Sequence, residues 1–123
     1  MKLAITATED RLDSDIDPRF GRCKYFIFVD PDTMDFEVVS NAASAGGAGI
    51  AAGQTVVTYG AKVVLTGDCG PNAYQVLSAA GIEVYTGVSG KIKDAIKDYK
   101  AGKLKAIGQA TVQPHHGLSS GQQ

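Results

Sequence analysis

The residues best suited to do chemistry form one short run, residues 17–23, with the sequence Asp-Pro-Arg-Phe-Gly-Arg-Cys. Two guanidinium groups and a thiol stand close together there, directly before an apolar segment. Arginine presents a fork of N–H donors that suits anions, and thiolate sulfur is a ligand of soft metals. Because Arg22 and Lys24 flank Cys23, we expect its thiol to ionise more readily than an isolated thiol. The run therefore predicts a binding site for a soft, anionic ligand.

Two glycine-bearing segments, residues 46–49 and 67–72, are candidates for the other walls of this site. Each precedes or opens an expected helix, whose N-terminus carries a partial positive charge and exposed backbone N–H groups. Ordinary turn formation is the alternative interpretation of either segment. The candidate ligand-binding residues are Arg19, Phe20, Gly21, Arg22, Gly46, Gly47, Gly49, Gly67, Gly70 and Asn72, and the candidate metal ligands are Cys23 and Cys69.

The hydrophobic pattern predicts the elements that position these residues. We expect strands at residues 2–7, 25–29, 36–39, 62–66 and 82–85, with a turn at 30–35 joining the second and third into a hairpin. Helices are expected at residues 50–59, from Pro71 to Gly81, and from a Ser89 cap to Gly102. Alternation of strand and helix favours parallel strands with right-handed crossovers. The expected fold is α/β, a mixed sheet of about five strands flanked by helices.

Composition limits the class of protein. A chain of 123 residues is the size of one domain, which we place at residues 1–108, followed by a flexible tail without periodicity at 109–123. The net charge of -1 provides no general attraction for nucleic acid, and the N-terminus lacks an apolar segment long enough for a leader or membrane span. Two cysteines without a Cys-x-x-Cys spacing fit a reducing compartment. We expect a cytoplasmic monomer that binds neither nucleic acid nor membranes.

Several other interpretations follow from individual motifs. Residues 47–52 match Gly-x-Gly-x-x-Ala with Asp68 about 20 residues on, as in a nucleotide-binding module, although the preceding strand ends too early for that turn. Cys23 and Cys69 could form a reversible redox pair, or be small buried apolar residues.

Two further motifs do not support a functional site. An Asp-x-Asp-x-Asp spacing at residues 13–17 resembles a calcium loop, but Pro18 and Lys24 replace its required glycine and glutamate, so Asp17 is more simply a partner for Arg19. The histidines, His115 and His116, both lie in the tail, which argues against a catalytic triad. No catalytic residue is therefore predicted.

Taken together, the motifs carry a family resemblance. Over about residues 1–104, the chain resembles the dinitrogenase iron-molybdenum cofactor biosynthesis family, which includes the NifX and NifB C-terminal type of domain. The matching segments are Arg19-Phe20-Gly21-Arg22, Gly46-Gly47-Ala48-Gly49, Gly67-Asp68-Cys69-Gly70-Pro71-Asn72-Ala73, Ala80-Gly81-Ile82 and Tyr99-Lys100-Ala101-Gly102-Lys103-Leu104.

The resemblance implies a ribonuclease H-like fold and a noncatalytic protein that carries a metal-sulfur cluster or a cofactor precursor. Its partners would be proteins that donate or accept the cluster. One branch, the orange proteins, is known for a molybdenum-copper sulfide cluster; an iron-molybdenum cofactor precursor is the other cargo implied. Many members have histidine where this chain has Arg19, so recognition by charge and hydrogen bonding is expected here. Nuclease activity is not implied, because the first strand carries no carboxylate to hold magnesium.

Overall fold

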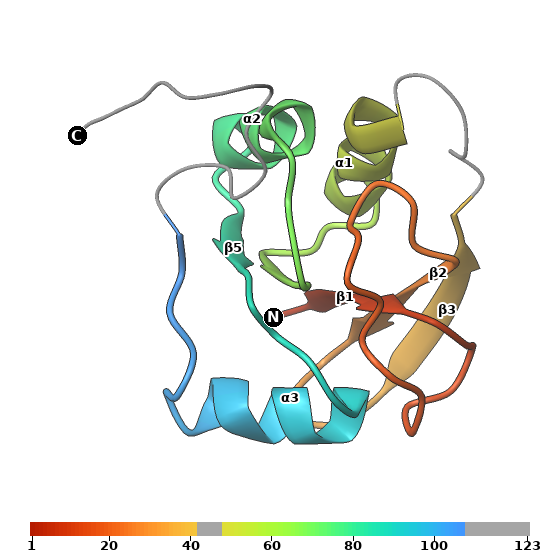
Figure 1. Ribbon diagram of the computed structural model, residues 1–123. Helices are drawn as coiled ribbons and strands as arrows, with labels where there is room; N and C mark the ends of the chain where they lie inside the picture. Colours follow the sequence, from red (N-terminus) through yellow and green to blue (C-terminus); the bar gives the residue numbers. More distant parts are fainter. Residues whose placement is uncertain (42–47, 108–123) are drawn as a thin grey trace.

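A computed structural model describes residues 1–41 and 48–107 and shows a five-stranded mixed sheet (Figure 1). The strands are β1 (Leu3–Ala7), β2 (Tyr25–Val29), β3 (Phe36–Ser40), β4 (Val63–Leu65) and β5 (Glu83–Tyr85). Their order across the sheet is β3-β2-β1-β4-β5. β1, β2 and β3 pair antiparallel, whereas β4 runs parallel to both β1 and β5. The expected α/β fold with an N-terminal hairpin is confirmed.

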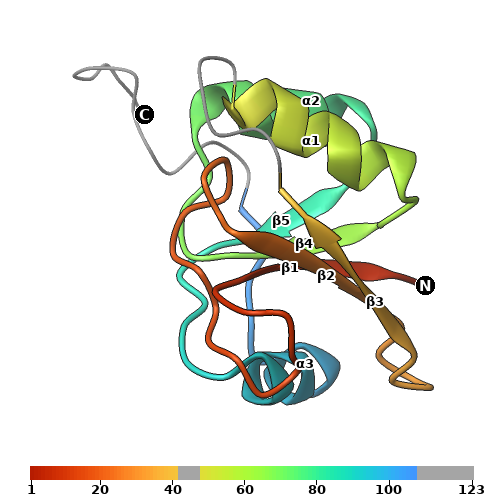
Figure 2. The same cartoon turned by 90° about the vertical axis from the view of Figure 1, so that its right-hand side faces the viewer.

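Helices cover both faces of the sheet (Figure 2). Helices α1 (Ala48–Thr58) and α2 (Pro71–Ala79) lie on one face, and α3 (Ile92–Lys100) lies on the other. Since β1 is central and covered on both sides, all five of its residues are buried and its sequence is apolar except for Thr6. The core beneath α1 and α2 includes a row of rings: Phe20 to Phe26 at 5.4 Å, Phe26 to Phe28 at 6.1 Å, and Phe28 to Tyr59 at 4.8 Å between centroids.

Glycines end the three helices as the sequence predicts. Gly60, Gly81 and Gly102 adopt φ angles of 78°, 75° and 73°, the left-handed conformation that glycine accepts without strain. Pro71 occupies the expected position at the start of α2. α1 begins at Ala48, slightly before the predicted Ile50.

The predicted Ser89 cap of α3 is wrong. The residue at the N-cap is Lys91, and its side chain makes no capping hydrogen bond. The N-terminal loop determines this start: the Ile92 N–H donates to the carbonyl of Ser14 at 3.0 Å, and Lys91 Nζ lies 3.3 Å from the carboxylate of Asp15. These tertiary contacts replace the local capping signal that the sequence offered. In the described part of the chain, α3 and the other helices are too short or too polar to cross a membrane.

Gly67 lets the loop that follows β1 pass over the end of β4. A Cβ placed on Gly67 would lie 2.6 Å from both Cα and the carbonyl oxygen of Pro18, inside the limit of atomic contact. On either side of this crossing, the Asp68 N–H donates to the Pro18 carbonyl at 2.8 Å and the Phe20 N–H donates to the Asp68 carbonyl at 3.3 Å. Gly67 is therefore required by backbone packing.

We predict that Gly67→Ala lowers the free energy of unfolding by about 1–3 kcal/mol, because backbone atoms must move to admit the methyl group. The midpoint of urea unfolding measures this change. Gly70→Ala is the matched control: Gly70 has an ordinary φ of -73° and no atom within 4 Å of its Cβ position, so its effect should be smaller. Equal destabilisation by the two variants would contradict the close approach at Gly67.

Candidate functional site

The candidate site lies where β1 and β4 end. After β1 the chain loops outward and returns through Pro18, Arg19 and Phe20 beside Asp68, which follows β4. Thr6 and Thr66 fix this junction from below, since their hydroxyls are 3.0 Å apart and Thr6 Oγ1 also donates to the Asp17 carbonyl at 2.7 Å. Two of the three predicted segments, residues 17–23 and 67–72, are thus brought together.

The N-terminal ends of α1 and α2 lie side by side above this junction (Figure 2). A Cβ on Gly49 would be 3.3 Å from the backbone nitrogen of Ala73, so the first turns of the two helices are almost in contact. Gly70, the N-cap of α2, offers no side-chain cap to the N–H groups that follow. Asn72 in that first turn is exposed. Two positive helix ends are thereby aimed toward the same region.

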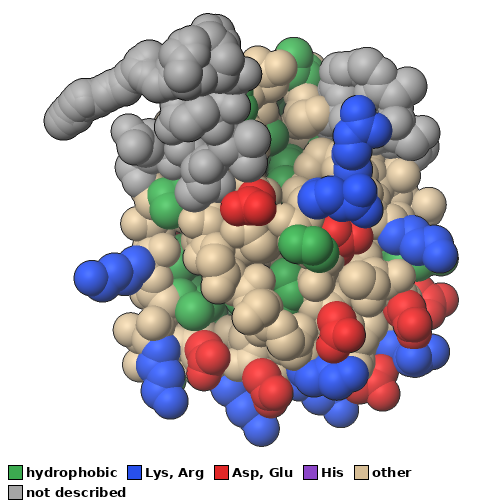
Figure 3. All heavy atoms as spheres, in the orientation of Figure 1, with side chains coloured by type: hydrophobic (Ala, Val, Ile, Leu, Met, Phe, Trp, Pro, Cys, Tyr) green, Lys and Arg blue, Asp and Glu red, His purple; other side chains and the backbone are tan. Residues whose placement is uncertain are grey.

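Three cationic side chains stand on the arginine loop, which we define as residues 17–24. Arg19, Arg22 and Lys24 are all exposed, and Lys and Arg side chains gather over this part of the surface (Figure 3). Together with Thr8, Asp17, Cys23, Tyr25, Ser40 and Asn41, they line a cavity of about 490 Å³. Three cations against the single carboxylate of Asp17, with hydroxyls and an amide beside them, suit an anion.

Asp17 supports this loop from within. Its side chain is only 7% exposed, and Oδ1 accepts a hydrogen bond from the Arg19 backbone N–H at 3.0 Å. The same oxygen lies 3.8 Å from Arg19 Nε, which confirms the predicted pairing. Because the Arg19 side chain remains 65% exposed, the pairing leaves it in contact with solvent at the site.

Asn41 is a residue of the site that sequence reasoning missed. Its side-chain amide donates to the carbonyl of Gly21 at 3.1 Å and to the carbonyl of Cys23 at 2.9 Å. It therefore ties the arginine loop to the end of β3, next to the segment that contains Gly46 and Gly47. The position of Asn41 in the sequence could have identified it. An asparagine that directly follows a strand and precedes a run of small residues is well placed to form hydrogen bonds with the backbone of a neighbouring segment.

The two thiols behave differently from expectation. Cys23 is 3% exposed and Cys69 is fully buried, and neither forms a disulfide. Burial raises the pKa of the Cys23 thiol to about 12, and the charge of Asp17 acts in the same direction. Burial also raises the pKa of Cys69 to about 11. The prediction that neighbouring cations promote ionisation of Cys23 is wrong in this conformation, because Arg22 and Lys24 point their charge into solvent while the sulfur lies in the core.

The remaining predicted residues divide into three groups. The ring of Phe20 is 2% exposed and packs in the core, so only its backbone borders the site. Gly21 belongs to the loop held by Asn41. Gly46 and Gly47, like the tail at 109–123, lie outside the described residues. Within the described residues, no cluster of three His, Cys, Asp or Glu side chains could hold a metal ion.

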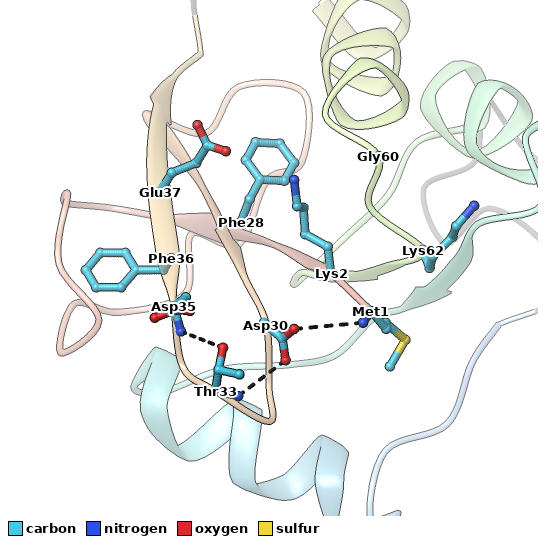
Figure 4. Close-up of a pocket in the computed structure, with 10 residues that line it drawn as sticks. All are labelled: Met1, Lys2, Phe28, Asp30, Thr33, Asp35, Phe36, Glu37, Gly60 and Lys62. Carbon is cyan, nitrogen blue, oxygen red and sulfur yellow. Dashed lines mark hydrogen bonds and ion pairs between the residues drawn. The ribbon is translucent and has the colours of Figure 1, made fainter.

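A second cavity, of about 580 Å³, lies at the opposite end of the sheet (Figure 4). Lys2 and Lys62 line it, but so do the carboxylates of Asp30, Asp35 and Glu37. The backbone N–H groups of Asp32 and Thr33 hold the pKa of Asp30 below its usual value. These three carboxylates offset the two lysines and the Met1 ammonium group, which lies 3.9 Å from Asp30 Oδ2. The second cavity therefore has no excess of positive charge for an anion, and it contains none of the predicted site residues.

Fold and site together define a small α/β domain whose exposed arginines and helix N-termini lie at one end of a mixed sheet. The chain belongs to the dinitrogenase iron-molybdenum cofactor family, whose model matches residues 1–102. The observed arrangement accords with the ribonuclease H-like fold expected of that family.

Solved structures agree with this assignment. The chain is 39% identical to the orange protein of Desulfovibrio gigas, solved in its apo form, with a TM-score of 0.87 over 90% of this chain and 96% of that chain. It is 32% identical to a putative NifB protein from Thermotoga, with a TM-score of 0.79 over 90% and 97% of the two chains. An uncharacterized protein of Methanocaldococcus jannaschii is 31% identical over 110 residues, which cover 85% of this chain and 90% of that protein.

The buried thiols generate a prediction about alkaline pH. An unfolded Cys23 ionises near its ordinary pKa of 9.0, whereas the folded thiol does so near 12. The unfolded state therefore loses its proton first, and the stability that Cys23 contributes is fully present below pH 9 and falls as the pH rises toward 12. The expected loss is about 1.4 kcal/mol per pH unit within that window.

Urea unfolding of the wild type and of Cys23→Ala across this range isolates the contribution, because other groups titrate equally in both proteins. The wild type should lose stability more steeply than the variant. Cys69→Ala serves as a second comparison. The pH-dependent difference in unfolding free energy between the wild type and this variant should end nearer pH 11. Parallel profiles for the wild type and Cys23→Ala would contradict a buried, neutral Cys23.

Proposed function

We propose that this protein is a noncatalytic carrier of an anionic metal-sulfur cluster or cofactor precursor. The observation that carries the proposal is the meeting of the arginine loop with Gly67 and Asp68, beneath the paired first turns of α1 and α2. Family membership supports the same class of ligand. Arginine side chains and backbone N–H groups would hold the negative charge of the cluster from several sides.

Each part of the site has a role in this proposal. Arg19 and Arg22 would bind terminal sulfide or oxide groups, with Lys24 adding charge. Gly49, Gly67 and Gly70 leave the backbone accessible, and Asn72 stands in the first turn of α2. Gly46 and Gly47, which lie outside the described residues, are included only on the basis of the sequence. Phe20 and Gly21 act through the backbone they position.

The thiols fit a secondary role. Neutral, buried sulfur is a poor metal ligand, because the thiolate is the form that coordinates. Charge and hydrogen bonding would therefore hold the cluster first. Coordination by Cys23, which borders the cavity at 3% exposure, would require loss of its proton, and coordination by the fully buried Cys69 would also require the core to open. The same burial disfavours a dithiol redox protein, since neither sulfur is accessible to an oxidant.

The cargo we propose is a molybdenum-copper sulfide cluster or an iron-molybdenum cofactor precursor, received from and delivered to other proteins in the cytoplasm. Such clusters carry several negative charges on soft sulfur atoms. The cationic wall at Arg19, Arg22 and Lys24 offsets that charge, while the chain as a whole carries a net charge of only -1. The attraction is thus local to the site.

Anaerobic reconstitution tests the proposal. Adding tetrathiomolybdate with a copper salt, or an isolated iron-molybdenum precursor in a parallel experiment, should produce a stoichiometric visible chromophore that stays with the protein through gel filtration. Arg19→Ala and Arg22→Ala should each weaken binding about tenfold or more, since each removes a charge-assisted hydrogen bond.

Arg11→Ala is the matched control. Arg11 is also an exposed arginine of the N-terminal region, but its charge is already paired with Glu9 and Asp13. It should bind cluster as the wild type does. A protein that stays colourless with both cargos would overturn the proposal, and equal losses for Arg11→Ala and Arg19→Ala would show that binding is merely nonspecific attraction.

A further inference from the structure

The two helices on one face of the sheet differ from the third in charge. The 11 residues of α1 and the 9 residues of α2 include no Asp, Glu, Lys or Arg. In α3, five of the nine residues are charged, and Figure 3 shows acidic and basic side chains intermixed over that part of the molecule. Exposed helices are normally charged on their solvent side. The uncharged layer therefore needs an explanation other than contact with water.

Helix α1 carries two exposed apolar side chains. Ile50 is 42% exposed and Val57 is 41% exposed, two of the five large hydrophobic residues exposed in the described structure. With the exposed Gln54 between them, they form a stripe at positions i, i+4 and i+7, the spacing of a helix-packing seam. A groove of about 480 Å³ lies beside the stripe, lined by Gln54, Val57, Thr58, Val76, Ala79 and Ala80.

We propose that this face docks a second copy of the same chain, in place of the monomer expected from the sequence, with the two α1 helices antiparallel about a two-fold axis near Gln54. The stripe is symmetric about its centre, so antiparallel pairing places Ile50 against the partner's Val57 and brings the two Gln54 amides together. Glutamine amides can donate and accept at once, which satisfies both at the axis. Ile50 of each copy then lies beside the facing groove, which Val57, Val76, Ala79 and Ala80 of the other copy line.

The absence of charge favours a second copy over a strongly acidic or basic partner. In a two-fold contact, a residue near the axis lies next to the same residue of the other copy. Any charged residue there would therefore be close to a like charge. The α1 and α2 surface avoids that repulsion entirely and leaves no ion to be desolvated. A strongly acidic or basic partner would find no complementary charge on this face. The uncharged composition of this face therefore suits contact between two copies of it.

The dimer would also affect the candidate site, although the inference does not depend on the proposed function. Ile50 directly follows Gly49, whose backbone borders Ala73 at the site. Antiparallel pairing carries the partner's Val57 to this rim. Each site would then be flanked by an apolar side chain from the other copy.

Sedimentation velocity from micromolar to millimolar concentration tests the inference. We expect a reversible monomer-dimer equilibrium for the wild type. Val57→Lys should raise the dimer dissociation constant about tenfold or more, because it places an unpaired ammonium group in the contact from each copy. Met34→Lys is the matched control, since Met34 is a comparably exposed apolar residue (37%) in the turn between β2 and β3, far from α1 in sequence. It should dimerise as the wild type does.

A cysteine crosslink tests the orientation. Gln54→Cys should form a disulfide-linked dimer on mild oxidation, because position 54 lies at the proposed axis and both native thiols are buried. Circular dichroism confirms that the variants fold. A wild type that remains monomeric at every concentration would overturn the inference, as would a dimer that survives Val57→Lys unchanged or fails to crosslink through position 54.

Discussion

The structure depends on the central position of β1, which pairs antiparallel with β2 and parallel with β4. This mixed pairing makes the end of β1 coincide with the end of β4 and with the beginning of β2, as the register partners Ala7 with Tyr25 and Ile5 with Leu65 show. The connection from β1 to β2 and the connection from β4 to α2 must therefore meet at one end of the sheet. The loop after β1 and the loop after β4 share hydrogen bonds there, and the arginines are carried to the same place. The candidate site is thus a consequence of strand direction before it is a consequence of any side chain.

The charged and neutral groups of the site lie at different depths below the surface. Cations lie at the surface on Arg19, Arg22 and Lys24, whereas the carboxylate of Asp17 lies beneath them with its oxygen engaged by backbone. Deeper still, the two thiols remain neutral, since burial raises the pKa of both. An anion approaching from solvent would meet positive charge first, and the neutral Cys23 thiol only at the base of the cavity. In the proposed function, this layering favours binding of a cluster by charge over coordination through thiolate.

Much of this arrangement could be predicted from local sequence signals. Glycine at the helix ends, proline at the start of α2 and the apolar strands all act within a few residues, and the structure agrees with them. Ser89 misled because a distant loop, through Ser14 and Asp15, determines where α3 begins. The prediction that the Cys23 thiol ionises readily was wrong, because charged neighbours in the sequence do not indicate which side chains face the core. Asn41 was missed since its partners, Gly21 and Cys23, are about 20 residues away.

Phe20 has a consequence for how a bound ligand could leave. It sits between the two arginines in sequence, yet its ring is the first in a row that continues through Phe26 and Phe28 to Tyr59. The arginine loop is consequently fastened to the core at its midpoint. Swinging the loop outward would transfer a phenylalanine ring to water at a cost of about 2 kcal/mol. A ligand held there is therefore more easily withdrawn by a competing acceptor reaching in from outside than released by a gate that opens.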